Sequence, residues 1–185
     1  LLRTELSRKN KHTDLQQRAL SGTGSAFFAA RKKGSFRRMI PHASNCRAVQ
    51  IFFIDLEALI REGVLTREEC DACDFGDNAS QIDYGKIYAQ RFALLRKAYE
   101  RSNINDSEGF HRFIEENSWW LDDYALFMSV KEFFGGQGWT QWPQDIRMHY
   151  GYALDYYREK LYFDVEFQKY LQFKFYEQWS KLKKY

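Results

Sequence analysis

Two tryptophans and two aspartates lie within five consecutive positions of the segment "ENSWWLDDYALFMSV", residues 115–129. An indole ring can stack on the apolar face of a sugar ring, and paired carboxylates can act as acid and base on a glycosidic bond. The same residue types also occur on an ordinary amphipathic helix with one wet face and one dry face. The segment therefore suggests either carbohydrate chemistry or helix packing.

The two aspartates, Asp122 and Asp123, are poorly placed to act as a catalytic pair. Neighbouring residues of a helix point about 100° apart, whereas the two carboxyl groups of a glycosidase flank the scissile bond at roughly 5–9 Å from each other. Carboxylates at such positions are usually solvated or lie near a helix N-terminus. We therefore predict that these residues are not the catalytic acids.

No other group of residues forms a complete active site. Cys70 and Cys73 make a C-x-x-C pair, but no second ligand pair accompanies it, so we predict two small residues near a helix end and no metal. The four histidines are scattered, and neither a P-loop nor a G-x-S-x-G elbow occurs. Trp139 and Trp142 lie in a loop bounded by glycine and proline and are the better aromatic candidates for function.

Helical periodicity dominates the chain after residue 50. The patterns predict a short helix containing Leu56 and Leu59 that stops at Gly63, a helix over 83–102, one or two helices over 107–134, and a helix over 153–184. Thr66 and Glu69 have the spacing of a capping box, and Asp106 or Ser107 is the expected cap of the third of these helices. Residues 51–54 are the one candidate for an extended segment. The fold class predicted is therefore mainly α.

Charge divides the chain near residue 50. Residues 1–50 hold 11 Lys and Arg against 2 Asp and Glu, whereas residues 51–185 hold 17 against 23. Residues 1–50 also show no sustained apolar period, so we predict a poorly ordered basic segment followed by a helical domain over 51–185. A basic segment of this kind is typical of nucleic-acid binding, and that reading rests on charge alone.

The location predicted is cytoplasmic. No run approaches the ~18 uninterrupted apolar residues of a membrane span, and the first residues lack the apolar core of a secretory signal. Three cysteines, Cys46, Cys70 and Cys73, form an odd set that argues against a disulfide framework. We expect no membrane association.

Four segments together resemble one enzyme family. They are "FIDLEALIREGVLT", "IDYGKIYAQRFALLRKAY", "WWLDDYALFMSVKEFFGGQGWTQWPQDIR" and "VEFQKYLQFKFYEQWSKLK", over roughly residues 52–184. In order and spacing this pattern resembles the amylomaltases, which are 4-α-glucanotransferases also called disproportionating enzymes.

The resemblance implies a (β/α)8 barrel of which this chain holds a helical insertion. It implies transfer of α-1,4-glucan segments to glucose or another glucan by a retaining double displacement, with α-1,4-glucans, maltooligosaccharides and glucose as partners, and no cofactor, metal or nucleic acid. It also implies glucan contacts at Tyr88 and Tyr84, and weaker ones at Trp120 and Asp122. The family's catalytic carboxylates are expected beyond residue 185, so this chain alone is expected to be inactive.

The resemblance stops near Phe53 on the N-terminal side. Where the family has a glucan-binding loop, this chain reads "RRMIPHASNCRAVQIFF". We hypothesise that residues 1 to about 50 are translated from a shifted reading frame, which makes their positive charge an accident. The alternative function, from another class, is a non-catalytic helical glucan-binding or scaffold module with a basic tail.

Overall fold

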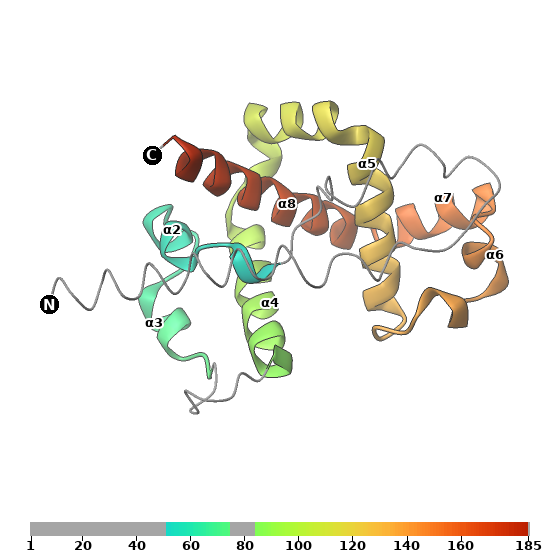
Figure 1. Cartoon of the computed structure of the whole chain (residues 1–185), viewed down its shortest axis with the longest axis horizontal. Helices are drawn as coiled ribbons and strands as arrows, with labels where there is room; N and C mark the ends of the chain where they lie inside the picture. The colour runs from blue at the N-terminus through green and yellow to red at the C-terminus, as the bar shows by residue number, and fades with distance from the viewer. Residues whose placement is uncertain (1–50, 75–83, 185) are drawn as a thin grey trace, which may run out of the picture. The chain divides into compact units, whose positions relative to one another are not determined.

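The computed structural model describes residues 51–74 and 84–184, and within these ranges it contains helices and no strand. They belong to one compact unit, residues 48–185. Figure 1 shows the helices in chain order: η3 (Ile51–Phe53), α2 (Leu56–Arg61), α3 (Arg67–Asp71), α4 (Tyr84–Arg101), η4 (Ile104–Asp106), α5 (Glu108–Phe133), η5 (Trp139–Gln141), α6 (Gln144–Arg147), α7 (Gly151–Lys160) and α8 (Tyr162–Lys183). The mainly α prediction is confirmed for this part of the chain, while the predicted disorder of residues 1–50 lies outside the described residues.

Local sequence signals set several helix ends. The Thr66 hydroxyl accepts a hydrogen bond from the Glu69 amide at 3.2 Å, and the Glu69 carboxylate accepts one from the Thr66 amide at 3.2 Å, which completes the predicted capping box. Ser107 caps α5 by accepting a hydrogen bond from the Phe110 amide. Gly63 follows α2 with φ of +78°, a conformation that glycine adopts without steric cost. These three predictions are confirmed.

Two other predictions need correction. The expected extended segment at residues 51–54 is wrong, because Ile51–Phe53 forms a 3-10 turn. The pattern over 153–184 predicted helix throughout, but α7 and α8 are separated at Leu161, where φ is −108° and ψ is 24°. The Leu161 amide still donates to the Tyr157 carbonyl and the Val165 amide to the Leu161 carbonyl, both at 2.9 Å. The apolar spacing continues across this residue, so periodicity does not reveal the break.

Helix α5 packs against α8 along much of its length, and Figure 1 shows α5 bending part-way along. In this helix the Asn117 side-chain amide donates to the Phe113 carbonyl at 2.8 Å, and the Ser118 hydroxyl donates to the Glu115 carbonyl at 3.1 Å. Side chains that bond to the preceding turn compete with the helical ladder and favour such bends. The bend lets one helix contribute to two separate hydrophobic clusters.

The first core joins α2, α4, η4, the residue that follows η3, the start of α5 and the middle of α8. Its buried members are Ile54, Leu59, Leu65, Leu94, Leu95, Ala98, Ile104, Phe110, Phe167, Tyr170 and Leu171. Aromatic rings meet at its centre, where the Phe167 ring lies 5.2 Å from Phe92 and 5.6 Å from Tyr99, centroid to centroid. Such pairs add to the free energy gained from burial alone.

The second core joins the end of α5, the following loop, α6, α7 and the first turn of α8. Its buried members are Ala125, Leu126, Val130, Trp142, Ile146, Ala153, Tyr157, Leu161 and Val165. Gly135 and Gly136, both with positive φ, end α5 and turn the chain toward α6. Helix α8 thus takes part in both cores.

Candidate functional site

Tyr88, the strongest predicted glucan contact, lies on α4 and is half-buried. Its hydroxyl donates a hydrogen bond to a carboxylate oxygen of Glu132 on α5 at 2.7 Å. Its ring stacks on Phe92, with centroids 5.5 Å apart, and meets the edge of Phe52 at 6.2 Å. The phenol is therefore fixed between two helices before any ligand binds.

The surroundings keep this phenol protonated. Burial raises the pKa of Tyr88 above its ordinary value, and the hydrogen bond to Glu132 and the negative charge of that carboxylate raise it further. A smaller contribution comes from the phenol of Tyr124, which lies on the neighbouring α5. Because its only proton is donated to Glu132, the Tyr88 hydroxyl can accept a hydrogen bond from a ligand, and the exposed part of its ring can contact one, but the group does not serve as a base near neutral pH.

Trp120 faces inward. Its side chain is 6% exposed, and its indole N–H donates to the side-chain oxygen of Asn117 at 3.1 Å. Its ring lies 6.0 Å from Tyr124 and 6.4 Å from Tyr176, centroid to centroid. This placement is that of a packed aromatic, while the adjacent Trp119 is 47% exposed. Glucan contact at Trp120 stays a prediction.

Asp122 and Asp123 make separate ion pairs. Asp122 lies 3.0 Å from the ammonium of Lys169 on α8, and Asp123 lies 3.9 Å from the guanidinium of Arg158 on α7. The two carboxylates thus bind cations on different helices. This geometry supports the prediction that they do not form a catalytic pair.

The predicted residues fall into two groups. Tyr88 contacts the end of α5, whereas Trp120 and Asp122 lie earlier on α5 and contact α8. Tyr124 is near both groups, since its ring contacts Trp120 and its phenol acts electrostatically on Tyr88. Tyr84 begins α4, but its side chain lies outside the described residues.

The two loop tryptophans have opposite environments. Trp142 is 5% exposed, and its indole N–H donates to the Gln137 carbonyl at 3.2 Å, so it is part of the second core. Trp139 is 42% exposed. Only Trp139 of this pair remains available as a surface aromatic.

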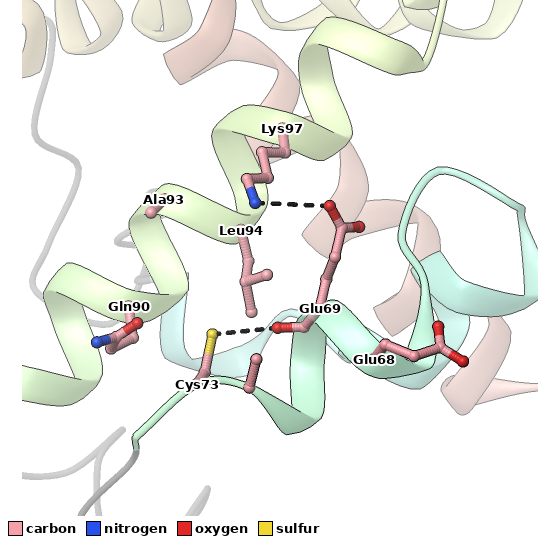
Figure 2. Close-up of a pocket in the computed structure, with 8 residues that line it drawn as sticks. Glu68, Glu69, Cys73, Gln90, Ala93, Leu94 and Lys97 are labelled. Carbon is pink, nitrogen blue, oxygen red and sulfur yellow. Dashed lines mark hydrogen bonds and ion pairs between the residues drawn. The ribbon is translucent and has the colours of Figure 1, made fainter.

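A recess of about 350 Å³ lies between α3 and α4, as Figure 2 shows. Its lining residues are Glu68, Glu69, Ala72, Cys73, Gln90, Ala93, Leu94 and Lys97. Glu69 reaches across to α4, with its carboxylate 3.5 Å from the Lys97 ammonium, whereas the Glu68 carboxylate points away (Figure 2). The two acids therefore do not face a common point.

Glu69 is held as an anion by its neighbours. The hydrogen bonds from the Arg101 guanidinium, at 2.8 and 2.9 Å, and from the Thr66 amide lower the pKa of Glu69 to about 2. A carboxylate with so low a pKa is a poor proton donor. The recess is therefore spanned by the Glu69–Lys97 ion pair and has no proton donor at Glu69.

Cys73 lines this recess, and both members of the C-x-x-C pair are free thiols. Burial raises the pKa of Cys70, and the Cys73 thiol donates to the Glu69 carbonyl at 3.4 Å. Protonated thiols are weak nucleophiles and weak metal ligands. Within residues 51–74 and 84–184, no group of three or more His, Cys, Asp and Glu side chains is placed to hold a metal ion.

Comparison with known proteins places the chain in a family. A family model described as 4-alpha-glucanotransferase matches residues 39–185, so the similarity extends further toward the N-terminus than the predicted start near Phe53. The chain belongs to the 4-α-glucanotransferase family. The resemblance that the sequence predicted is thereby confirmed.

Individual members of this family are similar over most of the chain. A 4-α-glucanotransferase from Clostridium butyricum is 40% identical over 134 residues, which cover 72% of this chain and 28% of that protein. One from Thermus thermophilus is 35% identical over 136 residues, which cover 71% of this chain and 26% of that protein. The chain thus spans little more than a quarter of the length of these relatives.

The helix arrangement is also shared. A solved amylomaltase from Streptococcus agalactiae, in complex with acarbose, superposes with a TM-score of 0.66 and 29% sequence identity, over 72% of this chain and 28% of that one. The family's mainly helical segment is therefore reproduced here. In addition, none of the helices in the described part of this family member is long and apolar enough to cross a membrane.

Sequence reasoning missed the residue that fixes Tyr88. Glu132 lies 44 positions further along the chain, near the end of α5. No local spacing connects two residues so far apart, so their contact follows only from the packing of α4 on α5. Glu132 is exposed and carries the acceptor that a sugar hydroxyl or Tyr88 can use.

Proposed function

We propose that this chain is part of an enzyme that transfers α-1,4-glucan segments to glucose or another glucan by a retaining double displacement. The observation that carries the proposal is the joint match, in sequence and in helix arrangement, to the 4-α-glucanotransferases. In this proposal the described helices form the helical insertion of a (β/α)8 barrel. The free thiols of Cys70 and Cys73 fit the reducing cytoplasm, where we place the enzyme.

The reaction has two displacements. A carboxylate attacks the anomeric carbon as the glycosidic C–O bond breaks, and a carboxylic acid gives its proton to the leaving oxygen. An acceptor hydroxyl then attacks the anomeric carbon of the glycosyl ester. It gives its proton to the residue that acted as the acid in the first step, and the nucleophilic carboxylate is released. Asp122 and Asp123 are paired with cations on separate helices, so we assign glucan binding, and not catalysis, to this part of the molecule.

Tyr88 is the residue that we propose contacts the glucan. Its position is fixed by Glu132 and by the stacked Phe92, so little side-chain freedom is lost when a sugar binds. Its phenol remains protonated, and its half-buried ring leaves part of its surface open. We propose Tyr84, one turn earlier on α4, as a second contact, with Trp120 and Asp122 as subordinate ones.

A hybrid enzyme tests the catalytic part of the proposal. Residues 51–185 replace the matching segment of the Clostridium butyricum enzyme, and glucose release from maltotriose is measured. We expect the hybrid to release glucose, and we expect Tyr88→Ala in the hybrid to lower kcat/KM about tenfold, equivalent to ~1.4 kcal/mol. Tyr88→Phe, which keeps the ring and loses the bond to Glu132, is the matched control. Its kcat/KM should lie between those of the unsubstituted hybrid and the Tyr88→Ala variant. A hybrid that melts cooperatively but releases no glucose would contradict the proposal.

The chain by itself tests the alternative function. We expect the chain to bind maltooligosaccharides and to release no glucose from maltotriose, because the described carboxylates form no facing pair. Maltooligosaccharide binding together with an inactive but folded hybrid would favour the alternative, a non-catalytic glucan-binding or scaffold module. Glucose release by the chain alone would show that the chain itself contains catalytic carboxylates.

A further inference from the structure

The exposed large hydrophobic side chains are concentrated on and around α7. Six of the ten in the described part of the chain fall within residues 148–163. They are Met148, Tyr150, Tyr152, Tyr156, Tyr162 and Phe163. All but Met148 are aromatic, and four are tyrosines, so this surface offers ring faces and hydroxyl groups in place of the aliphatic side chains that fill the two cores.

Three of these tyrosines form a defined group, which we call the α7 tyrosines: Tyr150, Tyr152 and Tyr156. Tyr152 and Tyr156 are four residues apart on α7 and therefore lie on the same face of the helix. They are 66% and 54% exposed. The Tyr150 ring, just before α7, lies 5.8 Å from that of Tyr152, centroid to centroid. Side by side, the rings can contact successive units of an extended ligand.

Other residues hold these rings in place. The Lys160 ammonium donates a hydrogen bond to the Tyr156 hydroxyl at 3.2 Å and lies 5.3 Å from the centre of the same ring. The edge of Tyr157, which is buried in the second core, meets Tyr156 at 5.1 Å. A ring that is already positioned loses less conformational entropy when it binds a ligand. Surface aromatics with such support are suited to recognition.

The charged side chains of α7 balance one another. Helix α7 carries Asp155, Arg158, Glu159 and Lys160, two of each sign, and the first two pair at 3.0 Å. A membrane surface or a nucleic acid needs excess positive charge, which is absent on this helix. A neutral polyol needs ring faces with donors and acceptors at their edges, and both are present.

We propose that the α7 tyrosines form a second α-glucan-binding surface, separate from the Tyr88 contact. The sugar rings stack on Tyr152 and Tyr156, and the sugar hydroxyl groups reach the charged side chains of α7. The choice of an α-glucan as the ligand rests on the proposed function. Such a surface holds part of a long glucan away from the residues that bind its reacting end.

Titration of the full chain with maltoheptaose, followed by amide NMR, tests this surface. Shifts on α7 report the α7 tyrosines, and shifts on α4 report Tyr88, so the two sites are read separately. We expect Tyr152→Ala/Tyr156→Ala to weaken binding at α7 at least fivefold, the effect of losing roughly 1 kcal/mol of ring contact. Tyr152→Phe/Tyr156→Phe keeps both rings and should stay within about twofold of the wild type. Tyr162→Ala, a substitution of another exposed tyrosine, should leave binding unchanged.

Several outcomes would overturn the inference. One is unchanged maltoheptaose binding in the double alanine variant, and another is equal binding of the β-linked cellohexaose. A third is a loss of self-association without a loss of glucan binding, which would make this face a contact between copies of the chain. Shifts confined to α4 would reject the α7 surface and leave the proposed function intact, whereas an inactive hybrid enzyme would reject the proposed function independently of shifts on α7.

Discussion

The two ends of α8 lie in different surroundings. From the middle of α8 toward its C-terminus, the first core is bordered by charged side chains: Lys174 lies 2.8 Å from a Glu62 oxygen, 112 positions away. At the same core, Glu69 of α3 accepts two hydrogen bonds from Arg101 of α4. Around the first turn of α8, the second core is bordered by exposed rings such as Tyr156, over which Lys160 lies. Charged side chains therefore border the first core, and exposed aromatic side chains border the second.

This difference separates two uses of the surface. Exposed ion pairs contribute little to the free energy of folding. Ion pairs that are partly buried and joined by two hydrogen bonds fix the position of a short helix against a longer one. The five-residue α3 depends on such contacts because it contributes no buried residue of its own. The aromatic border of α7 fixes nothing across the fold and stays open. We therefore assign stability to the first border and ligand binding to the second.

The largest change in stability is expected from a comparison of two phenylalanines that lie one turn apart on α8. Phe167 is fully buried in the first core, whereas Phe163 is 74% exposed. We expect Phe167→Ala to reduce the free energy of unfolding by about 3–5 kcal/mol, since it removes burial and leaves a cavity. Phe163→Ala should change it by less than about 0.5 kcal/mol. Urea denaturation measures both, and a similar loss in the two variants would contradict the comparison.

A smaller loss is expected when the ammonium at the border of the first core is removed. Burial lowers the pKa of Lys174, but the hydrogen bonds that its ammonium donates to Glu62 and Glu177 outweigh this effect, so the pKa is raised overall. Lys174→Met leaves both carboxylates without this cation and should cost about 1–3 kcal/mol in urea denaturation.

The matched control is Lys181→Met on the same helix. Lys181 also pairs with Glu177, at 3.1 Å, but its side chain is 67% exposed. We expect a change below about 0.5 kcal/mol. Equal losses in the two lysine variants would show that burial of the ammonium does not matter.

Acid should weaken the same border through Glu69. Its pKa is lowered from 4.5 to about 2 in the folded chain, so its stabilising effect is present above about pH 4.5 and is lost as the pH falls toward 2. We expect the melting temperature of the wild type to fall over this range and that of Glu69→Gln to fall less. The exposed Glu116→Gln serves as a control and should follow the wild type. Parallel pH profiles for all three proteins would rule out Glu69 as the acid-sensitive contact.

The smallest effect is expected on the aromatic border. Tyr152→Ala/Tyr156→Ala should change the free energy of unfolding by less than about 0.5 kcal/mol per residue, because both side chains are more than half exposed. Thermal and urea denaturation of the double variant measure this change. A loss of several kcal/mol would mean that these rings support the fold, and the contrast between the two borders would disappear.

The parts of the fold that the sequence predicts are those controlled by neighbouring residues. Thr66 and Glu69 are three positions apart, and Gly63 acts through its own backbone, so each signal is complete within one turn. The break at Leu161 is different. The residue continues the apolar spacing and carries no glycine or proline signal, so only its packing in the second core reveals it.

The candidate site shows the same limit more strongly. Tyr88 was predicted through the family resemblance, but the contact with Glu132 spans 44 residues and depends on the packing of two helices. Trp139 and Trp142 lie three positions apart in the same loop, yet only Trp142 is buried in the second core. Residue type therefore identifies aromatics suited to sugars, and tertiary packing decides which of them are free to meet one.

The position of α8 in both cores also has a consequence for biosynthesis. A ribosome makes this helix after all the other described helices, at roughly 5–20 residues per second. Until α8 leaves the exit tunnel, the apolar faces of α2, α4 and α5 lack the helix that covers them. The nascent chain must therefore remain exposed to chaperones for several seconds, and a slower translation of α8 should lengthen that period and increase aggregation.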